Sequence, residues 1–298
     1  MKRLKIFSLT LAVLTLGACG DDFLDSEPIT TVTDVNFYKT PDDGYKALIG
    51  CYDGLQRVWS SGLALPVASE VFSDNAFGGT GNSDPFGYQM IDEFDKSRSA
   101  SDLNLFESNW SAYYRAVYRC NTLIGKLGQI EWGSDQELKP VYESEARFIR
   151  AYLYFDMVRL WGNIPLITEP TAENVPQADP DDVYKLIAED LKFAAENLPA
   201  VAYTSQPSST YGRVTKWAAE ALLARVYLFY TGYYEQTDLV GVVSKAQALA
   251  YVEDVIANGG FGLVDDFAKL WPAASVADYA GEDNKETVFA IKYTYTSN

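Results

Sequence analysis

The sequence predicts an all-α protein of antiparallel helix pairs, packed like irregular tetratricopeptide repeats, with long loops and a short terminal strand. Several segments of helical length carry start signals at one end and glycine or proline at the other. One of them, residues 215–231, is apolar nearly all round, with Glu220 and Arg225 as its charges after Lys216. Such a helix must be buried on several sides, which stacked helix pairs achieve. Small and aromatic residues mix here as in tetratricopeptide repeats, but without a strict period.

The first helix of the domain is expected from Pro41 to about Trp59. Thr40 is a good N-cap, and Pro41 suits the first helical position because its missing N–H would have no partner there. Asp42 and Asp43 follow in the first turn, where their charges complement the positive end of the helix dipole. This concentration of start signals predicts a helix that begins at residue 41.

Later helices are expected where similar signals recur. Residues 134–137 have the spacing of a capping box, and Pro140 is expected to mark the start of a helix that Gly162 ends. Residues 179–182 repeat the Pro-Asp-Asp start signal after an aspartate cap. A run rich in β-branched and aromatic residues at 287–293 predicts the short strand. The later helices are expected at residues 103–127, 140–161, 180–198, 215–231 and 244–258.

The beginning of the chain has the features of a bacterial lipoprotein signal peptide. Basic residues precede an apolar run at 6–16, which is too short to span a bilayer core of about 30 Å. The end of this segment, Leu-Gly-Ala-Cys at 16–19, resembles a lipobox, which implies cleavage before Cys19 and its acylation. The alternative is an ordinary secretory signal with a chance cysteine. The chain is therefore divided into a signal peptide at 1–18, a lipidated extended lead-out at 19–40 and a helical domain at 41–298.

The composition excludes several classes of function. Acidic side chains outnumber basic ones by 41 to 24, which gives a formal net charge of −17 and makes nucleic acid an unexpected partner. The chain has no histidine, which excludes histidine-dependent serine or cysteine catalysis and histidine-ligated zinc. Residues 74–78 and 179–181 lack the spacing of a calcium loop, and no phosphate-binding loop is present. Carboxylates are too numerous to single out a glycosidase pair, so we expect a protein that is not an enzyme and has no metal or cofactor.

Two cysteines fall within the helical domain. Cys51 and Cys120 lie in expected helices among apolar neighbours. Export would place them in an oxidising compartment, where a disulfide is possible, whereas two buried free thiols is the simpler interpretation. The sequence does not fix the distance between them, so both alternatives stay open.

The best candidate for a binding site is the irregular stretch at residues 60–101, and within it the loop at 73–88. Long loops inside compact domains are usually functional or disordered. Rings stack on sugar faces, while carboxylates and amides accept hydrogen bonds from sugar hydroxyls. The alternative is a solvated turn region with its rings packed into the scaffold. The candidate ligand-binding residues are Asp74, Asn75, Phe77, Asn82, Asp84, Phe86 and Tyr88.

Two other groups of conspicuous side chains are expected to be structural. Helical spacing predicts core packing for the aromatic group Trp110, Tyr113 and Tyr114 with Val117 and Tyr118. The charges within the aromatic helix at 140–161 are expected to be buried as ion pairs, because an unpaired charge there would be costly. The spacing predicts the pairs Glu143–Arg147 and Asp156–Arg159, and Arg150 lies on the same helix.

The order of these segments resembles a known family. After the lipobox come CGDDFLD at 19–25, TPDDGYKALIGCYDGL at 40–55, SEVFSDNAF at 69–77, YYRAVYRCNTLI at 113–124, EARFIRAYLYFDMVRLWGNIPLIT at 145–168, DDVYKLIAEDLKFAAENLP at 181–199 and GRVTKWAAEALLARVYLF at 212–229. Together they resemble the SusD/RagB family of nutrient-binding outer-membrane lipoproteins of the Bacteroidetes.

The resemblance implies a function and a location. It implies a lipid-anchored protein of the outer membrane that faces the cell exterior, captures an oligosaccharide and delivers it to a TonB-dependent SusC-like transporter as its lid. It also places Asp74 where family members have an acidic residue near the ligand. Family members continue past the length of this chain, so we expect an amino-terminal portion with an incomplete site. The alternatives are a lid that binds peptide rather than glycan, and a helical-repeat scaffold that binds only protein.

Overall fold

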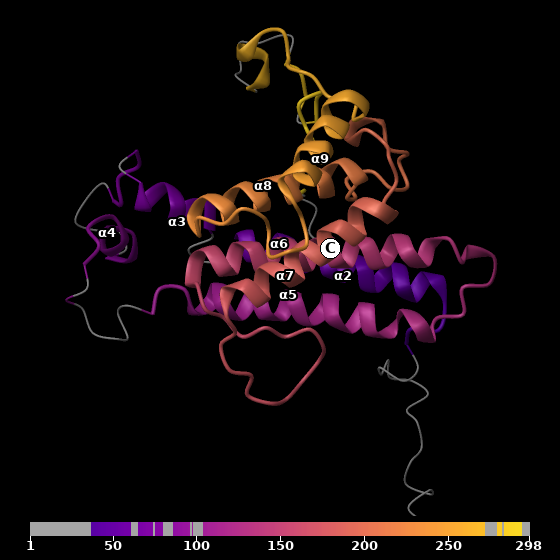
Figure 1. Ribbon diagram of the computed structural model, residues 1–298, viewed down its shortest axis with the longest axis horizontal. Coiled ribbons are helices and arrows are strands. Elements are labelled where there is room, and N and C mark those ends of the chain that lie inside the picture. Colours follow the sequence, from indigo (N-terminus) through magenta and orange to yellow (C-terminus); the bar gives the residue numbers. More distant parts are fainter. Residues whose placement is uncertain are drawn as a thin grey trace, which may run out of the picture.

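The described part of the chain is helical, which confirms the predicted fold class (Figure 1). In the described residues no helix is long and apolar enough to cross a membrane. The predicted signal peptide, the lead-out up to residue 36 and the lipidation site Cys19 lie outside these residues. The computed structural model describes residues 37–60, 65–73, 75–79, 86–95, 97, 104–271, 279–281 and 283–293.

Six long helices form the scaffold, and helices that follow one another in this series pack side by side. Neighbouring helices are antiparallel, so the beginning of one helix contacts the end of the next. At the α5–α6 contact, for example, Trp110 lies against Trp161, whereas Asn121 lies against Arg150. The six helices are α2 (Pro41–Ser60), α5 (Glu107–Lys126), α6 (Leu138–Trp161), α7 (Pro180–Asn197), α8 (Lys216–Tyr233) and α9 (Lys245–Asn258).

Local capping chemistry fixes where several of these helices begin. Thr40 and Asp43 exchange hydrogen bonds before α2, with the Thr40 N–H donating to Asp43 Oδ2 at 2.9 Å. Asp179 Oδ1 accepts from the backbone N–H of Asp181 at the start of α7. Ser244 and Gln247 form a complete capping box at the start of α9. These contacts confirm three predicted helix starts.

Two helix starts differ from the prediction. Helix α6 begins at Leu138, so Pro140 lies in its first turn, where an N–H has no partner within the helix. Residues 134–137 do not form a capping box; Gly133–Asp135 is a 3₁₀ turn instead. Helix α5 begins at Glu107 rather than 103. Gly162, with φ of +69°, ends α6 as predicted.

The irregular stretch at 60–101 contains two short helices that the sequence did not predict, α3 (Leu65–Phe72) and α4 (Phe86–Asp92). The predicted strand at 287–293 is wrong, because these residues are described and form no strand. A strand needs a partner strand, and instead Phe289 packs its ring edge-to-face on Phe148 of α6. Within the described residues, the β-type pairings are isolated bridges at Pro165–Gln177 and Leu239–Val243.

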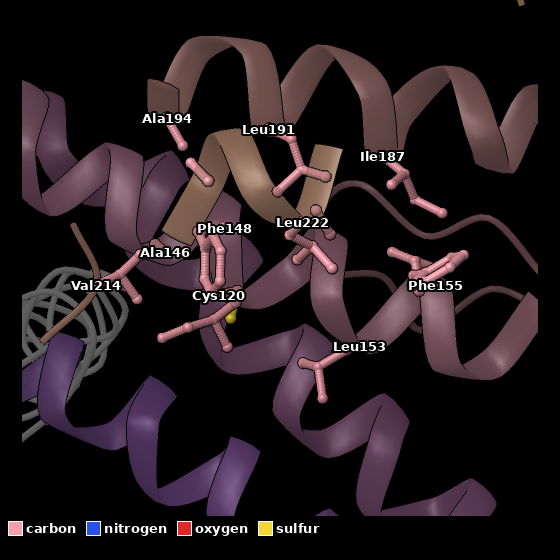
Figure 2. Packing of buried hydrophobic residues seen from close by; sticks show 14 of the residues in the cluster. Cys120, Ala146, Phe148, Leu153, Phe155, Ile187, Leu191, Ala194, Val214 and Leu222 are labelled. Atoms are coloured by element: carbon pink, nitrogen blue, oxygen red, sulfur yellow. The ribbon is translucent and has the colours of Figure 1, made fainter. Parts of the chain in front are cut away.

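Helix α6 lies at the centre of the scaffold and touches α2, α5, α7 and α8. Figure 2 shows Phe148, Leu153 and Phe155 of α6 among side chains from the neighbouring helices, such as Leu191 and Leu222. All three α6 side chains are buried. Burial of this apolar face supplies the main driving force for the helix stack.

The charges on α6 are paired, as predicted. Arg150 binds both carboxylate oxygens of Asp190 on α7, at 2.8 and 2.9 Å, and donates to Asn121 of α5. The predicted pairs Glu143–Arg147 and Asp156–Arg159 both form. These contacts tie three helices together and leave no uncompensated buried charge on α6 in the described part of the chain.

A second buried network joins two of the sequence motifs that carry the family resemblance. Glu145, in the EARF segment, accepts two hydrogen bonds from the guanidinium of Arg213, in the GRV segment. The Tyr52 hydroxyl of α2 donates to Glu145 at 2.6 Å and accepts from the N–H of Val214. The network therefore fixes the approach to α8 against α2 and α6.

Cys51 of α2 and Cys120 of α5 are free, buried thiols. They lie in contact across the helix interface, and the hydrogen bond between them, together with burial, raises the pKa of the Cys51 thiol.

Candidate functional site

The described residues of the predicted binding loop belong to a small lobe beside one end of the long helices, apart from the scaffold core (Figure 1). We call this the α3–α4 lobe and define it as the described residues of 65–95. Its two helices pack on each other around Val71 and Ile91, and Tyr88 packs against this pair. The lobe therefore has its own apolar centre, separate from the main core.

Three phenylalanine rings are exposed on this lobe. Phe77, outside any helix, is 79% exposed; Phe94, after α4, is 62% exposed; and Phe72, at the end of α3, is also exposed. The rings of Phe72 and Phe94 lie 5.8 Å apart, centroid to centroid. Exposed apolar groups gathered in one place mark interaction surfaces, and ring faces suit the C–H faces of sugars.

The backbone of the lobe is constrained at several positions near these rings. Phe94 has φ of +49°, which is uncommon for a residue with a side chain and costs on the order of 1 kcal/mol or more. Gly78 lies so close to α4 that a β-carbon there would be 2.4 Å from the Tyr88 carbonyl oxygen. The hydroxyl of Ser73 donates to the Glu70 carbonyl at 2.8 Å and accepts from the N–H of Asn75 at 3.3 Å.

The structure separates the predicted site residues into different groups. Phe77 and Asn75 are exposed on the lobe, as a binding role requires. Tyr88 lies on α4 rather than in a loop, and its half-buried ring packs against the lobe's apolar centre. Phe86 is the first residue of α4. Asp74, Asn82 and Asp84 lie outside the described residues.

Two rings of this surface were missed by the sequence prediction. Phe72 stands in the SEVFSDNAF segment next to the predicted loop, so a slightly wider boundary would have included it. Phe94 has a left-handed backbone, and no neighbouring glycine or asparagine in the sequence indicates one there. The sequence therefore offers no reason to expect this ring at the surface.

The chemistry offered by the described residues is that of a binding surface. Gln89 of α4 and Glu93, just after this helix, are exposed, and the Gln89 amide donates a hydrogen bond to the Glu93 carboxylate at 2.9 Å. Within the described residues, no group of three or more acidic or cysteine side chains is placed to hold a metal ion.

The aromatic group on α5 only partly follows the prediction of core packing. Tyr113 and Val117 are buried, and the Tyr113 hydroxyl donates to Asp156 at 3.1 Å. Trp110 and Tyr114 are only half-buried, and Tyr118 is exposed, because α5 lies at the surface of the stack.

Known proteins resemble this chain in sequence and in fold. A SusD-like protein of Bacteroides ovatus is 28% identical over 97% of this chain and 50% of its own length. A solved laminarin-binding SusD-like protein is 28% identical, with a TM-score of 0.65 over 82% of this chain and 50% of its own. Surface glycan-binding protein A from Bacteroides fluxus is 26% identical, with a TM-score of 0.65 over 84% of this chain and 50% of its own.

The chain spans about half the length of the curated relatives it matches. Residues 22–228 match the SusD-like family described as "Starch-binding associating with outer membrane". This match covers more than half of the chain, and the solved relatives share its helical fold. The chain therefore belongs to the SusD-like family.

Proposed function

We propose that this protein binds glycan and that the α3–α4 lobe forms one wall of the binding site. The observation that carries the proposal is the group of exposed rings, Phe72, Phe77 and Phe94, on the lobe. The family resemblance adds Asp74, which follows Ser73 in the same segment of the chain. The names of two solved relatives, a laminarin-binding protein and a surface glycan-binding protein, support the same class of ligand. Non-enzymatic binding fits a surface of rings and hydrogen-bonding groups.

We further propose that the protein is lipid-anchored through Cys19 in the outer membrane, faces outward and covers a SusC-like TonB-dependent transporter as its lid. The lipobox at 16–19 and the family description support the anchor and the membrane. In cells, Cys19→Ala should abolish lipid labelling and release the protein from outer membranes. Retention of both properties in the variant would contradict the anchor.

The test of glycan binding uses affinity electrophoresis of this chain through a panel of polysaccharides that includes laminarin, followed by calorimetry with the one that retards it. Phe77→Ala and Asp74→Ala should each weaken binding about tenfold, or ~1.4 kcal/mol. Loss of a stacking ring explains the first effect, and loss of a charged hydrogen-bond acceptor explains the second.

The matched control is Phe267→Ala, which removes a similarly exposed ring far along the chain on the 3₁₀ turn Phe267–Leu270. This variant should bind as the wild type does. If the wild type and all three variants are folded by circular dichroism and bind with equal affinity, the lobe is not part of the binding site.

The second candidate is a scaffold that binds only protein or peptide. The exposed Leu249 and Ile256 on α9 favour it, because apolar side chains exposed together on one helix are typical of a protein-binding surface. The exposed rings of the lobe favour glycan, since Phe77 lies outside any helical face that a partner helix would match. If the ligand is a peptide, the protein should be retained on immobilised peptides and should not be retarded by any polysaccharide of the panel.

A further inference from the structure

We propose a second binding site, a groove along the outer face of α5 that takes an oligosaccharide carrying carboxylate groups, such as a chain of uronic acids. The inference rests on the proposed glycan-binding function but uses none of the residues of the α3–α4 lobe.

Two parallel rows of side chains run along α5 and line this groove. Trp110, Tyr114 and Tyr118 recur every four residues and form an aromatic row; Ser111, Arg115 and Arg119 form a polar row beside it. Residues four apart share one face of a helix, and each row extends about 12 Å along the axis. The aromatic row lines a hollow of about 650 Å³, and the polar row lines both this hollow and a second one of about 520 Å³. We call these two adjoining hollows the groove.

The opposite wall of the groove is held in place before any ligand arrives. It comes from the loop between α6 and α7 and includes Ile167 and Thr171. The Ile167 N–H donates to the Tyr154 hydroxyl at 2.8 Å, and the Ile167 carbonyl accepts from Tyr154 and from Asn121, each at 2.8 Å. The Tyr114 hydroxyl donates to the Pro165 carbonyl at 2.9 Å. A wall fixed in this way loses little conformational freedom on binding.

The charge in the groove is opposite to that of the whole protein. Arg119 pairs with Asp53 and donates to the Gly50 carbonyl. Arg115 is exposed and, within the described residues, has no carboxylate or other hydrogen-bond partner. Glu107 is the acidic side chain that lines the groove, and it accepts from Asn104. In a chain with a net charge of −17, this unneutralised guanidinium favours an anionic ligand.

The combination of groups favours a sugar acid over other anions. A guanidinium matches a carboxylate with two parallel hydrogen bonds. The ring of Tyr118, 50% exposed, lies three residues after Arg115 on α5, so the two are neighbours on the helix surface, and it offers a face for the sugar ring. The hydroxyls of Ser108 and Ser111 line the same groove and suit the sugar's own hydroxyls. The aromatic row would therefore stack on the sugar ring of a uronic acid unit, while the free guanidinium of Arg115 would bind its carboxylate.

The test is calorimetry of this chain with oligogalacturonate and alginate oligosaccharides at low salt. Arg115→Gln and Tyr118→Ala should each weaken binding about tenfold or more, and added salt should weaken binding to the wild type. Arg225→Gln is the matched control, since it removes an exposed arginine of α8 that also lacks an ion-pair partner in the described residues. Phe77→Ala should leave uronate binding unchanged.

Three results would overturn the proposal, provided that circular dichroism shows every variant folded. They are no uronate binding by the wild type, equal effects of Arg115→Gln and Arg225→Gln, or tighter Arg115-dependent binding of a poly-glutamate peptide, which would make the occupant an acidic peptide. Failure of the lobe instead appears as unchanged neutral-glycan binding in Phe77→Ala, so the two failures are distinguishable.

Discussion

Individual buried charges show how this acidic chain tolerates ionisable groups inside a helix stack. Glu220 of α8 is buried, and its Oε1 lies 3.3 Å from Lys216 Nζ. Lys216 is shared, because its Nζ lies 2.6 Å from Asp254 of α9. Burial is the main cause that raises the pKa of Glu220 to about 7; Lys216 opposes this shift and Asp254 adds to it.

The raised pKa predicts how stability depends on pH. Between pH 5 and 7 the folded chain keeps the Glu220 proton, whereas the unfolded chain, with an ordinary pKa near 4.5, has released it. Protonation of Glu220 therefore stabilises the fold near pH 5. As the pH rises to 7 this contribution is lost, and the free energy of unfolding falls by up to about 1.4 kcal/mol per pH unit.

Glu220→Gln should remove this dependence. The difference in free energy of unfolding between wild type and variant, measured by urea denaturation at several pH values, should change in favour of the variant as the pH rises from 5 to 7. A difference that stays constant over this window would contradict the raised pKa. Glu253→Gln, at an exposed position on α9, is the control and should show no such change.

At the scale of elements, the sequence predicted what depends on local chemistry. Long helices with caps, such as those beginning at Pro41, Pro180 and Lys245, were placed within a residue or two because capping is a short-range interaction. The helices α3 and α4 were missed because eight and seven residues are too few to show a helical period. The strand at 287–293 was wrong because β pairing depends on a distant partner.

The same limits apply to the candidate site. Phe77 was selected because it stands in an irregular, ring-rich loop, and it is exposed. Phe94 was not selected, because it lies outside that loop and no neighbouring glycine or asparagine indicates its left-handed backbone. The packing of Tyr88 could not be predicted, because a ring that fills a small apolar centre has the same sequence signature as one that contacts a ligand. The α5 groove was missed because half-buried and fully buried rings share one helical spacing.

Helix α6 is the element on which the stack's stability depends most. Phe155 lies in the core, edge-to-face with Tyr184 of α7 and Phe229 of α8. Phe155→Ala should lower the free energy of unfolding by roughly 3–5 kcal/mol through lost burial and a residual cavity. Leu222→Ala should cost roughly 2–5 kcal/mol, toward the low end because Leu222 already borders a hollow.

Exposed Leu228 on α8 provides the control for both variants. Leu228→Ala should change the free energy of unfolding by less than about 0.5 kcal/mol in the same urea titrations. A loss for Phe155→Ala as small as that for Leu228→Ala would place α6 at the surface of the stack.

At the scale of the whole molecule, the helix stack that stabilises the fold is separate from the lobe that we propose as the binding surface. The helix stack from α2 to α9 holds its buried charges in pairs, such as Arg150 with Asp190 and Glu145 with Arg213, while the α3–α4 lobe carries three exposed phenylalanine rings. The chain spans about half the length of its curated relatives, so the lobe is proposed as one wall of the site rather than the whole.

The central claim is that glycan meets the protein at the α3–α4 lobe, and hydrogen exchange tests it most directly. Backbone exchange of this chain would be followed with and without a saturating amount of the polysaccharide that retards it in electrophoresis. We predict slower exchange in residues 65–95 on binding, and no change in α9, which lies at the far end of the helix series. Protection confined to α9 or to other parts of the stack, with residues 65–95 unchanged, would contradict the claim.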